Sequence, residues 1–267
     1  MALIRPLLAA FLAMVALAAR ADAGEFVHFK SGKATLIGYL AQPRGNGPFP
    51  AAVLLHGSGG FHASMLSWAD RLSRWGYVAF AVDSFSPRGR QGQGNVAKEQ
   101  AGDAFAALHH LAGLPHVRAN AVALIGFSYG GISTLADLEQ GSSIARLYPD
   151  KFRAGVAFYP ACSGSSGLMA VPTLILIGEL DDWTPAADCA DMAAGKSVIP
   201  VSRQAGDRSN VTLIVYPGAY HAFDITDLDI LPGRGGTVED HHVEYNEAAT
   251  KDAAQQVRAF LGRTLKD

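Results

Sequence analysis

Residues 126–130 read Gly-Phe-Ser-Tyr-Gly and fit the pattern G-x-S-x-G around Ser128. The pattern follows an apolar run at 121–125 and precedes a helix-like segment at 132–138. At such a strand-to-helix turn, glycines let the chain reverse sharply and expose the serine hydroxyl, while the helix N-terminus faces charge developing on a substrate. The pattern also occurs by chance in ordinary turns. The position of the pattern between a strand and a helix is what predicts that Ser128 is a nucleophile.

A serine hydroxyl becomes a good nucleophile when a histidine takes its proton and an acid holds that histidine in one tautomer. On a sheet of this kind the expected chain order is serine, acid, histidine. Asp181 follows the apolar run 173–178, and His221 follows the run 211–216. Because each candidate comes after a different strand, we predict a triad of Ser128, Asp181 and His221.

Other acids and histidines compete for these roles. Glu179 and Asp182 flank the preferred acid, and Asp182 could instead cap the helix that Pro185 helps to start, or be a solvated loop charge. Among the other histidines are two that lie inside an expected helix and two that lie in a polar stretch near the end of the chain, namely His109, His110, His241 and His242. Neither pair follows a strand, which favours His221.

An acyl-transfer site also needs backbone N–H groups that stabilise the oxyanion of the transition state. The residue after the nucleophile, Tyr129, supplies one such donor, and the loop 56–60, His-Gly-Ser-Gly-Gly, follows the strand-like run 51–55 and would supply the other. We expect the second donor to be Ser58, with Gly57 as the alternative. His56 is expected to be structural rather than a base.

The elements that must position these groups alternate regularly. Helical spacing appears at 66–72, 101–112 and 253–261, between strand-like runs that are mostly continuous rather than alternating in hydrophobicity. These runs lie at 26–29, 36–40, 51–55, 77–82, 121–126, 154–159, 173–178 and 211–216. The pattern predicts an α/β fold: one mostly parallel sheet of about eight strands with helices on both faces. Ligands of such sheets bind beyond the carboxyl ends of the strands.

Length, composition and charge place few limits on function. The 267 residues have a formal net charge of −2, which provides no basic field for nucleic acid or anionic lipid. A dinucleotide-binding reading of Gly57 to Gly60, with Asp83 as the ribose ligand, fails because the third glycine of G-x-G-x-x-G is replaced by His62. We therefore expect a small-molecule partner and no cofactor or metal.

The first residues resemble an export signal. A positively charged start is followed by an apolar run at 6–19 and by Ala-Asp-Ala at 21–23, a small–x–small cleavage pattern. The run is short for a membrane span, although an uncleaved anchor is the alternative. We expect 1–23 to be a signal peptide, 24–267 to form a single domain, and the product to be periplasmic or secreted without stable membrane association. In an oxidising compartment Cys162 and Cys189 could pair, the alternative being two buried thiols.

Together these motifs resemble the dienelactone hydrolase family of the α/β-hydrolase superfamily. The resemblance covers nearly all of the chain after residue 23, and it depends on 126–130, on 178–185 as G-x-x-D-x-x-x-P and on 216–221 as Y-P-G-x-x-H. It implies the same triad and an enzyme that hydrolyses esters or lactones. The sequence departs from the enzymes that named the family, which have a cysteine nucleophile and an acidic residue where this chain has His56-Gly57.

The resemblance also suggests residues that would contact the substrate. Arg88 stands near the position of an arginine that binds a substrate carboxylate in the family, although it could equally brace its loop. Phe85, Trp183 and Phe223 would form an apolar acyl pocket, or belong to the core. The short link between 159 and 173 leaves no room for a lid domain. Peptide, thioester or peracid chemistry on the same triad, or a non-catalytic binding module, are the alternative functions.

Overall fold

The structure is a computed structural model that describes residues 24–90, 97–196, 210–226, 228 and 237–266. The expected signal peptide at 1–23 lies outside the described residues. So does part of the segment between the expected histidine and the C-terminal helix.

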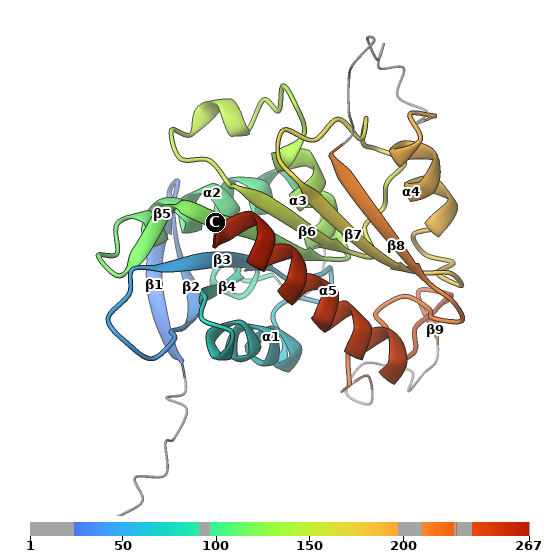
Figure 1. Ribbon diagram of the computed structural model, residues 1–267, viewed down its shortest axis with the longest axis horizontal. Helices are drawn as coiled ribbons and strands as arrows, with labels where there is room; N and C mark the ends of the chain where they lie inside the picture. Colours follow the sequence, from blue (N-terminus) through green and yellow to red (C-terminus); the bar gives the residue numbers. More distant parts are fainter. Residues whose placement is uncertain (1–23, 91–96, 197–209, 227, 229–236, 267) are drawn as a thin grey trace, which may run out of the picture.

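One eight-stranded sheet forms the centre of the molecule (Figure 1). Its strands are β1 (Glu25–Ser31), β2 (Ala34–Ala41), β3 (Phe49–Leu55), β4 (Val78–Asp83), β5 (Val117–Phe127), β6 (Ala154–Phe158), β7 (Thr173–Gly178) and β8 (Val211–Tyr216). Their spatial order is β1-β2-β4-β3-β5-β6-β7-β8. Strand β2 runs antiparallel to both β1 and β4. The other six strands, β3 to β8, are parallel to one another. The expected mostly parallel sheet is confirmed.

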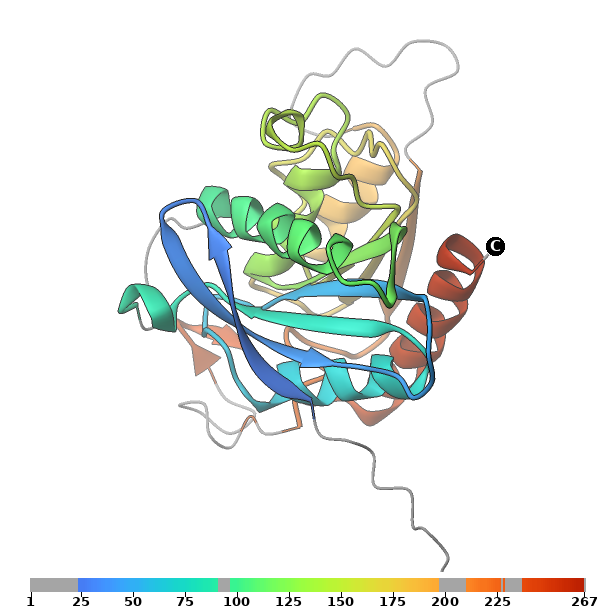
Figure 2. The same ribbon diagram turned by 90° about the vertical axis from the view of Figure 1, so that its left-hand side faces the viewer.

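Helices cover both faces of this sheet. They are α1 (Ala63–Arg74), α2 (Ala97–Ala112), α3 (Tyr129–Leu138), α4 (Ala186–Ala193) and α5 (Glu247–Leu265), with short 3₁₀ helices η1 (Ser86–Arg88) and η2 (Ala145–Leu147). Helices α1 and α5 lie on one face, and α2, α3 and α4 lie on the other (Figures 1 and 2). The central strands are buried on both sides, which explains why β6 is apolar throughout and β7 is apolar after its first residue, Thr173.

Two further elements lie near the C-terminal edge of the sheet, and only the first, the helix after Pro185, was indicated by the sequence. Helix α4 is short and begins after Pro185, and a two-stranded hairpin, β9 (Thr237–Val238) with β10 (His241–His242), lies near the end of the chain. The segment 159–172, all of it described, leads from β6 to β7 without a helix. The absence of a helix in this segment agrees with the expectation that no lid domain is inserted there.

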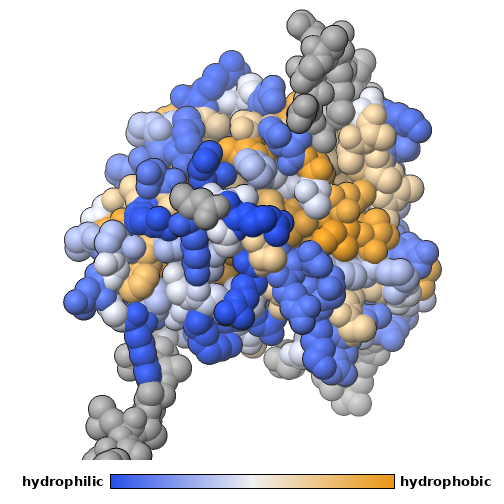
Figure 3. Space-filling model, in the orientation of Figure 1, coloured by the Kyte–Doolittle hydropathy of each residue, from blue (hydrophilic) through white to orange (hydrophobic). Residues whose placement is uncertain are grey.

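The surface facing the viewer in Figure 3 is mostly hydrophilic, with an apolar area over the edge strand β8. Val215 on this strand is 39% exposed. None of the helices in the described part of the chain combines the length and apolar character needed to cross a membrane.

Candidate active site

Ser128 lies at the sharp turn between β5 and α3. Its backbone has φ 51° and ψ −112°, a conformation that costs free energy for a residue with a side chain. The turn is held by a hydrogen bond from the Ser128 N–H to the carbonyl oxygen of Phe158, at 2.9 Å. A Cβ atom at Gly126 would lie 2.0 Å from the Gly130 carbonyl oxygen, and one at Gly130 would lie 2.4 Å from the Leu55 carbonyl oxygen. Both glycines of the motif are therefore required by close backbone packing.

His221, on the loop after β8, bridges the serine and an acid. Its Nε2 lies 2.9 Å from Ser128 Oγ, and its Nδ1 lies 2.7 Å from Asp181 Oδ2. The histidine and the acid are 2% and 4% exposed, so the contacts are shielded from water. An imidazole with a carboxylate on one nitrogen and a hydroxyl on the other can accept the hydroxyl proton. The three residues expected from the sequence are thus brought together.

Asp181 is held in one orientation by its own loop. Its Oδ1 accepts hydrogen bonds from the backbone N–H groups of Trp183 and Thr184, at 3.0 and 2.8 Å. The hydroxyl of Thr184 lies 2.9 Å from the other oxygen, Oδ2, and 3.2 Å from Nδ1 of His221. Oδ2 is thereby directed at the imidazole.

Thr184 was not singled out from the sequence, yet its hydroxyl contacts the other two triad residues, Asp181 and His221. Its hydroxyl also lies 3.1 Å from the backbone oxygen of Tyr159, at the end of β6. The local signal for it is the spacing Asp-x-x-Thr, since an Asp side chain often accepts hydrogen bonds from the backbone two and three residues later. That spacing predicts the turn, although it does not predict the contact with the histidine.

The competing acids have other partners. Asp182 accepts the backbone N–H of His242 at 3.1 Å, and Glu179 accepts that of Gly218 at 3.0 Å. Helix α4 starts at Pro185 without a side-chain cap, so Asp182 does not cap it. Both carboxylates therefore hold the loops around the site in place.

His56 is fully buried beneath the loop after β3. Its Nε2 accepts the backbone N–H of Ser84 at 3.2 Å, which places the proton on Nδ1, 2.7 Å from the Gly57 carbonyl oxygen. Burial lowers the pKa of His56 because the charged imidazolium is poorly solvated there. These contacts agree with a structural role for His56.

The loop expected to form half of an oxyanion hole lies against the nucleophile. A Cβ at Gly57 would lie 3.3 Å from the Ser128 Cβ, so Gly57 and the adjacent Ser58 border the serine. Tyr129 is the first residue of α3, and the first N–H groups of a helix have no acceptor within it. Oxyanion donors at Tyr129 and at Ser58 or Gly57 stay a prediction.

The candidate substrate contacts fall into different environments. Arg88 donates to both oxygens of Asp103, at 2.7 and 2.8 Å, and to the Ser84 carbonyl oxygen at 2.7 Å. Phe85 is 2% exposed and packs edge-on against His56. Phe223 is fully buried among other aromatic residues of the core. Arg88 therefore braces its loop, and Phe85 and Phe223 belong to the core, which was the alternative interpretation of each residue.

Trp183, in contrast, is partly exposed beside the histidine. Its ring centroid lies 5.1 Å from that of His221, and its other neighbour is His241, which stacks on it at 5.1 Å. Residue 221 also forms an isolated parallel bridge with Val243. The polar stretch that contains His241 therefore lies beside the site.

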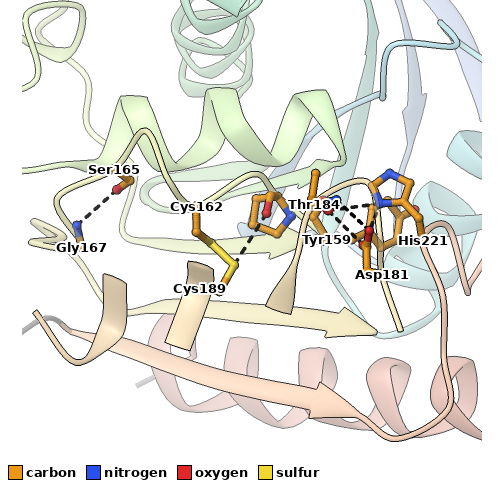
Figure 4. The surroundings of a disulfide bond; sticks show 9 residues. Tyr159, Cys162, Ser165, Gly167, Asp181, Thr184, Cys189 and His221 are labelled. Atoms are coloured by element: carbon orange, nitrogen blue, oxygen red, sulfur yellow. Dashed lines mark hydrogen bonds and ion pairs between the residues drawn. A yellow bond between two sulfur atoms is a disulfide. The ribbon is translucent and has the colours of Figure 1, made fainter. Parts of the chain in front are cut away.

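A disulfide joins the loop after β6 to helix α4. Cys162 and Cys189 are bonded, and Figure 4 shows the bond close to Tyr159, Asp181 and Thr184. The disulfide thus connects the loop after β6 to the helix that follows the loop carrying Asp181. Within the described residues no group of three or more His, Cys, Asp or Glu side chains is arranged to hold a metal ion.

Comparisons with known proteins agree on one family. The dienelactone hydrolase family matches residues 36–265 of this chain. A candidate carboxymethylenebutenolidase of Synechocystis sp. is 24% identical, over 86% of this chain and 93% of its own length. A candidate 2-oxo-3-(5-oxofuran-2-ylidene)propanoate lactonase of Bradyrhizobium sp is 25% identical, over 70% of this chain and 78% of its own.

Solved structures show the same fold. The crystal structure of a candidate dienelactone hydrolase from Klebsiella pneumoniae superposes with a TM-score of 0.64 at 20% identity, covering 90% of this chain and 98% of that one. The strand order, the serine turn and the family match all lead to one conclusion. This protein belongs to the dienelactone hydrolase family and is a hydrolase with the α/β-hydrolase fold.

Proposed function

We propose that this protein is an exported serine hydrolase that cleaves carboxylic esters or lactones of small substrates through an acyl-enzyme on Ser128. The observation that carries the proposal is the imidazole of His221, which lies 2.9 Å from the Ser128 hydroxyl and 2.7 Å from the Asp181 carboxylate.

In the first half of the reaction, Ser128 Oγ attacks the substrate carbonyl carbon while His221 Nε2 takes the hydroxyl proton. The resulting imidazolium is stabilised by Asp181, and the oxyanion accepts hydrogen bonds from the N–H of Tyr129 and from that of Ser58 or Gly57. The carbon–oxygen bond then breaks, and His221 returns its proton to the leaving alkoxide. In a lactone the leaving alcohol stays attached to the acyl group.

In the second half, water takes the place of the leaving alcohol. His221 removes a proton from a water molecule, whose oxygen attacks the acyl carbon, and the proton then passes to Ser128 Oγ as the ester bond to the enzyme breaks. The products are a carboxylic acid and the regenerated serine. Each step needs one base in one tautomer, which the contact with Asp181 maintains.

The substrate class follows from the family and the local surroundings. The two relatives above are named for lactone or ester hydrolysis, which supports these bonds as targets. The nucleophile here is a hydroxyl where the family's namesakes use a thiol. Trp183 supplies an apolar surface beside the histidine, and the link between β6 and β7 adds no lid, which favours small, freely entering substrates.

Export is supported by the chain before β1 and by the cysteines. The small–x–small pattern at 21–23 ends just before Gly24, and β1 begins at Glu25, so cleavage there would leave the sheet intact. A disulfide persists in oxidising compartments such as the periplasm. Mass spectrometry of the chain purified after expression in a bacterial host should find Gly24 as the first residue, and an intact start in the cytoplasmic fraction would contradict the proposal.

Activity profiling tests the reaction directly. The protein should hydrolyse p-nitrophenyl esters, with short acyl chains preferred, and simple lactones, and a fluorophosphonate should label Ser128. Ser128→Ala should lose labelling and lose hydrolysis by about a million-fold. Hydrolysis that survives in Ser128→Ala, or activity confined to peptides, thioesters or perhydrolysis, would refute the proposed chemistry.

A further inference from the structure

A second buried carboxylate lies close behind the triad. Asp224 follows His221 by three residues and is 7% exposed. Its Oδ2 accepts the indole N–H of Trp68 at 2.7 Å, and its Oδ1 accepts the hydroxyl of Tyr159 at 2.6 Å. These bonds tie the histidine loop to helix α1 and to the end of β6.

Tyr159 connects this carboxylate with the histidine. Its side chain is 1% exposed, and its ring centroid lies 4.6 Å from the imidazole of His221. Its backbone oxygen lies 3.1 Å from the Thr184 hydroxyl, beside the triad acid. Its φ of 39° is unusual for a residue with a side chain, so the surrounding contacts hold it in place. Tyr159 therefore contacts His221 through its ring and Asp224 through its hydroxyl.

The charges around Asp224 come from several elements. Burial raises the pKa of Asp224 above its ordinary value, and the hydrogen bonds from Tyr159 and Trp68 and the nearby His62 offset only part of this rise. Arg71 on α1 also faces Asp224, with its guanidinium 4.8 Å from the Trp68 ring. An indole nitrogen can only donate, so Oδ2 is the acceptor in this contact. Two hydrogen-bond donors and the guanidinium of Arg71 together suit an anion at this position.

His221 in turn faces groups from four elements. Asp181 and Thr184 come from the loop after β7, Ser128 from the turn after β5, and the ring of Tyr159 from the end of β6, while His241 of β10 lies beyond Trp183. Asp181 contacts the imidazole directly, whereas Asp224 is linked to it through Tyr159.

We propose that Asp224 is a positioning residue for His221, a buried anion that holds the Tyr159 ring against the imidazole and stabilises the imidazolium formed when His221 takes the serine proton. The proposal rests on the proposed serine hydrolase function. A brace alone would not need the charge, because a neutral amide fits between the same two partners, and burying a carboxylate costs more free energy than burying an amide.

The replacement Asp224→Asn separates charge from architecture. The amide oxygen can accept from Trp68, and the amide nitrogen can donate to the Tyr159 hydroxyl, so both links remain while the negative charge is lost. The rate of Ser128 labelling by a fluorophosphonate, measured from pH 4.5 to 9, reports on the imidazole without needing the natural substrate. We expect the acid limb of this profile to move to lower pH by roughly one unit and the plateau rate to fall about fivefold.

Asp252→Asn is the matched control. Asp252 also pairs with a tyrosine hydroxyl, that of Tyr216 at 3.1 Å, but it lies on α5, away from the imidazole. Its profile should coincide with that of the unaltered protein. A shift of the same size in Asp252→Asn would show that the effect is not specific to Asp224.

A further variant keeps the test open should Asp224→Asn fail to fold. Tyr159→Phe keeps the ring against His221 and removes one donor from Asp224, so the carboxylate binds a proton more readily and the acid limb should move in the same direction by less. An unchanged limb in a folded Asp224→Asn or Tyr159→Phe protein overturns this inference. If the unaltered protein is not labelled at Ser128, the proposed function itself fails.

Discussion

Arg88 and Asp103 form a two-pronged ion pair, in which both oxygens of the carboxylate accept hydrogen bonds from one guanidinium, at 2.7 and 2.8 Å. Asp103 on α2 is 1% exposed and also accepts the hydroxyl of Ser31 on β1. The pair therefore joins the loop after β4 to α2 and to the edge of the sheet. The donors that would bind a substrate carboxylate are directed at a carboxylate of the protein itself.

Arg88→Ala should accordingly lower stability rather than substrate affinity. The change leaves Asp103 buried without its partner, which should cost about 3 kcal/mol in urea unfolding, while KM for short esters stays within twofold. Arg90→Ala, which removes a more exposed pair with Glu99, should cost less than about 1 kcal/mol. A higher KM for anionic esters with unchanged stability would instead establish Arg88 as a substrate ligand.

Thr184→Val should slow catalysis without weakening binding. The valine has a similar shape but lacks the hydroxyl that lies near Asp181, His221 and the Tyr159 carbonyl oxygen. We expect kcat on a short p-nitrophenyl ester to fall about tenfold with little change in KM, because the acid is less well oriented. Thr184→Ser retains the hydroxyl and should recover most of the rate. Equal losses in both variants would argue that packing of the methyl group, not the hydroxyl, matters.

Removing the disulfide should destabilise the fold. The bond closes a loop between residues 27 apart in sequence, so the unfolded chain of a Cys162→Ser, Cys189→Ser protein gains conformational freedom worth roughly 3 kcal/mol. Urea unfolding of this variant should match that of the unaltered protein kept in reductant. Comparable midpoints for the oxidised protein and the variant would contradict a stabilising role.

His56 should make the protein less stable in acid. Burial depresses its pKa in the folded state, whereas the unfolded chain has the ordinary value of about 6.5. The unfolded state therefore binds more protons below that pH, and the stability contributed by neutral His56 is present above about pH 6.5 and is lost as the pH falls.

His56→Asn tests this, since its amide can donate to the Gly57 carbonyl oxygen but does not titrate. Urea unfolding between pH 5 and 8 should show a flatter pH dependence for His56→Asn than for the unaltered protein. His28→Asn, at an exposed position on β1, should leave the slope unchanged. A slope unaffected by His56→Asn would mean that other groups cause the acid sensitivity.

Asp137 on α3 should make the protein less stable as the pH rises, which is the opposite of the effect of His56. Its carboxylate is buried, both oxygens lack a hydrogen-bond partner within the described structure, and burial raises its pKa well above the ordinary value. The folded state thus binds the proton more tightly than the unfolded chain, whose pKa is about 3.9. The stability contributed by protonated Asp137 is complete below that pH and is lost as the pH rises towards the folded pKa.

Asp137→Asn replaces this group with a neutral one of the same shape. Its unfolding free energy relative to the unaltered protein should rise steadily from pH 4 to 8, because the unaltered protein must either keep a proton or bury a charge. Asp191→Asn, at an exposed position on α4, serves as the control. A difference that does not vary with pH would show that Asp137 has a partner that neutralises it.

Much of the framework was predictable from local patterns. The strands β7 and β8 match their predicted bounds, because continuous apolar runs that end at Gly178 and at Pro217 leave little choice of register or length. The order serine, acid, histidine was also predictable, since each residue follows a strand and parallel strands end at the same edge of the sheet. What the sequence by itself determined is therefore the sheet and the loops that lie at its active edge.

The tertiary structure alone decided which side chains meet. The contact of Tyr159 with Asp224, the ion pair of Arg88 and the stack of Trp183 on His241 each join residues that are far apart or on different loops. Neither the periodicity of the sequence nor the adjacent residues predict these partners, because a side-chain contact depends on the path of two loops and on the packing between them. A strand needs only its own run of residues, whereas a contact requires the whole fold to bring two side chains within about 3 Å.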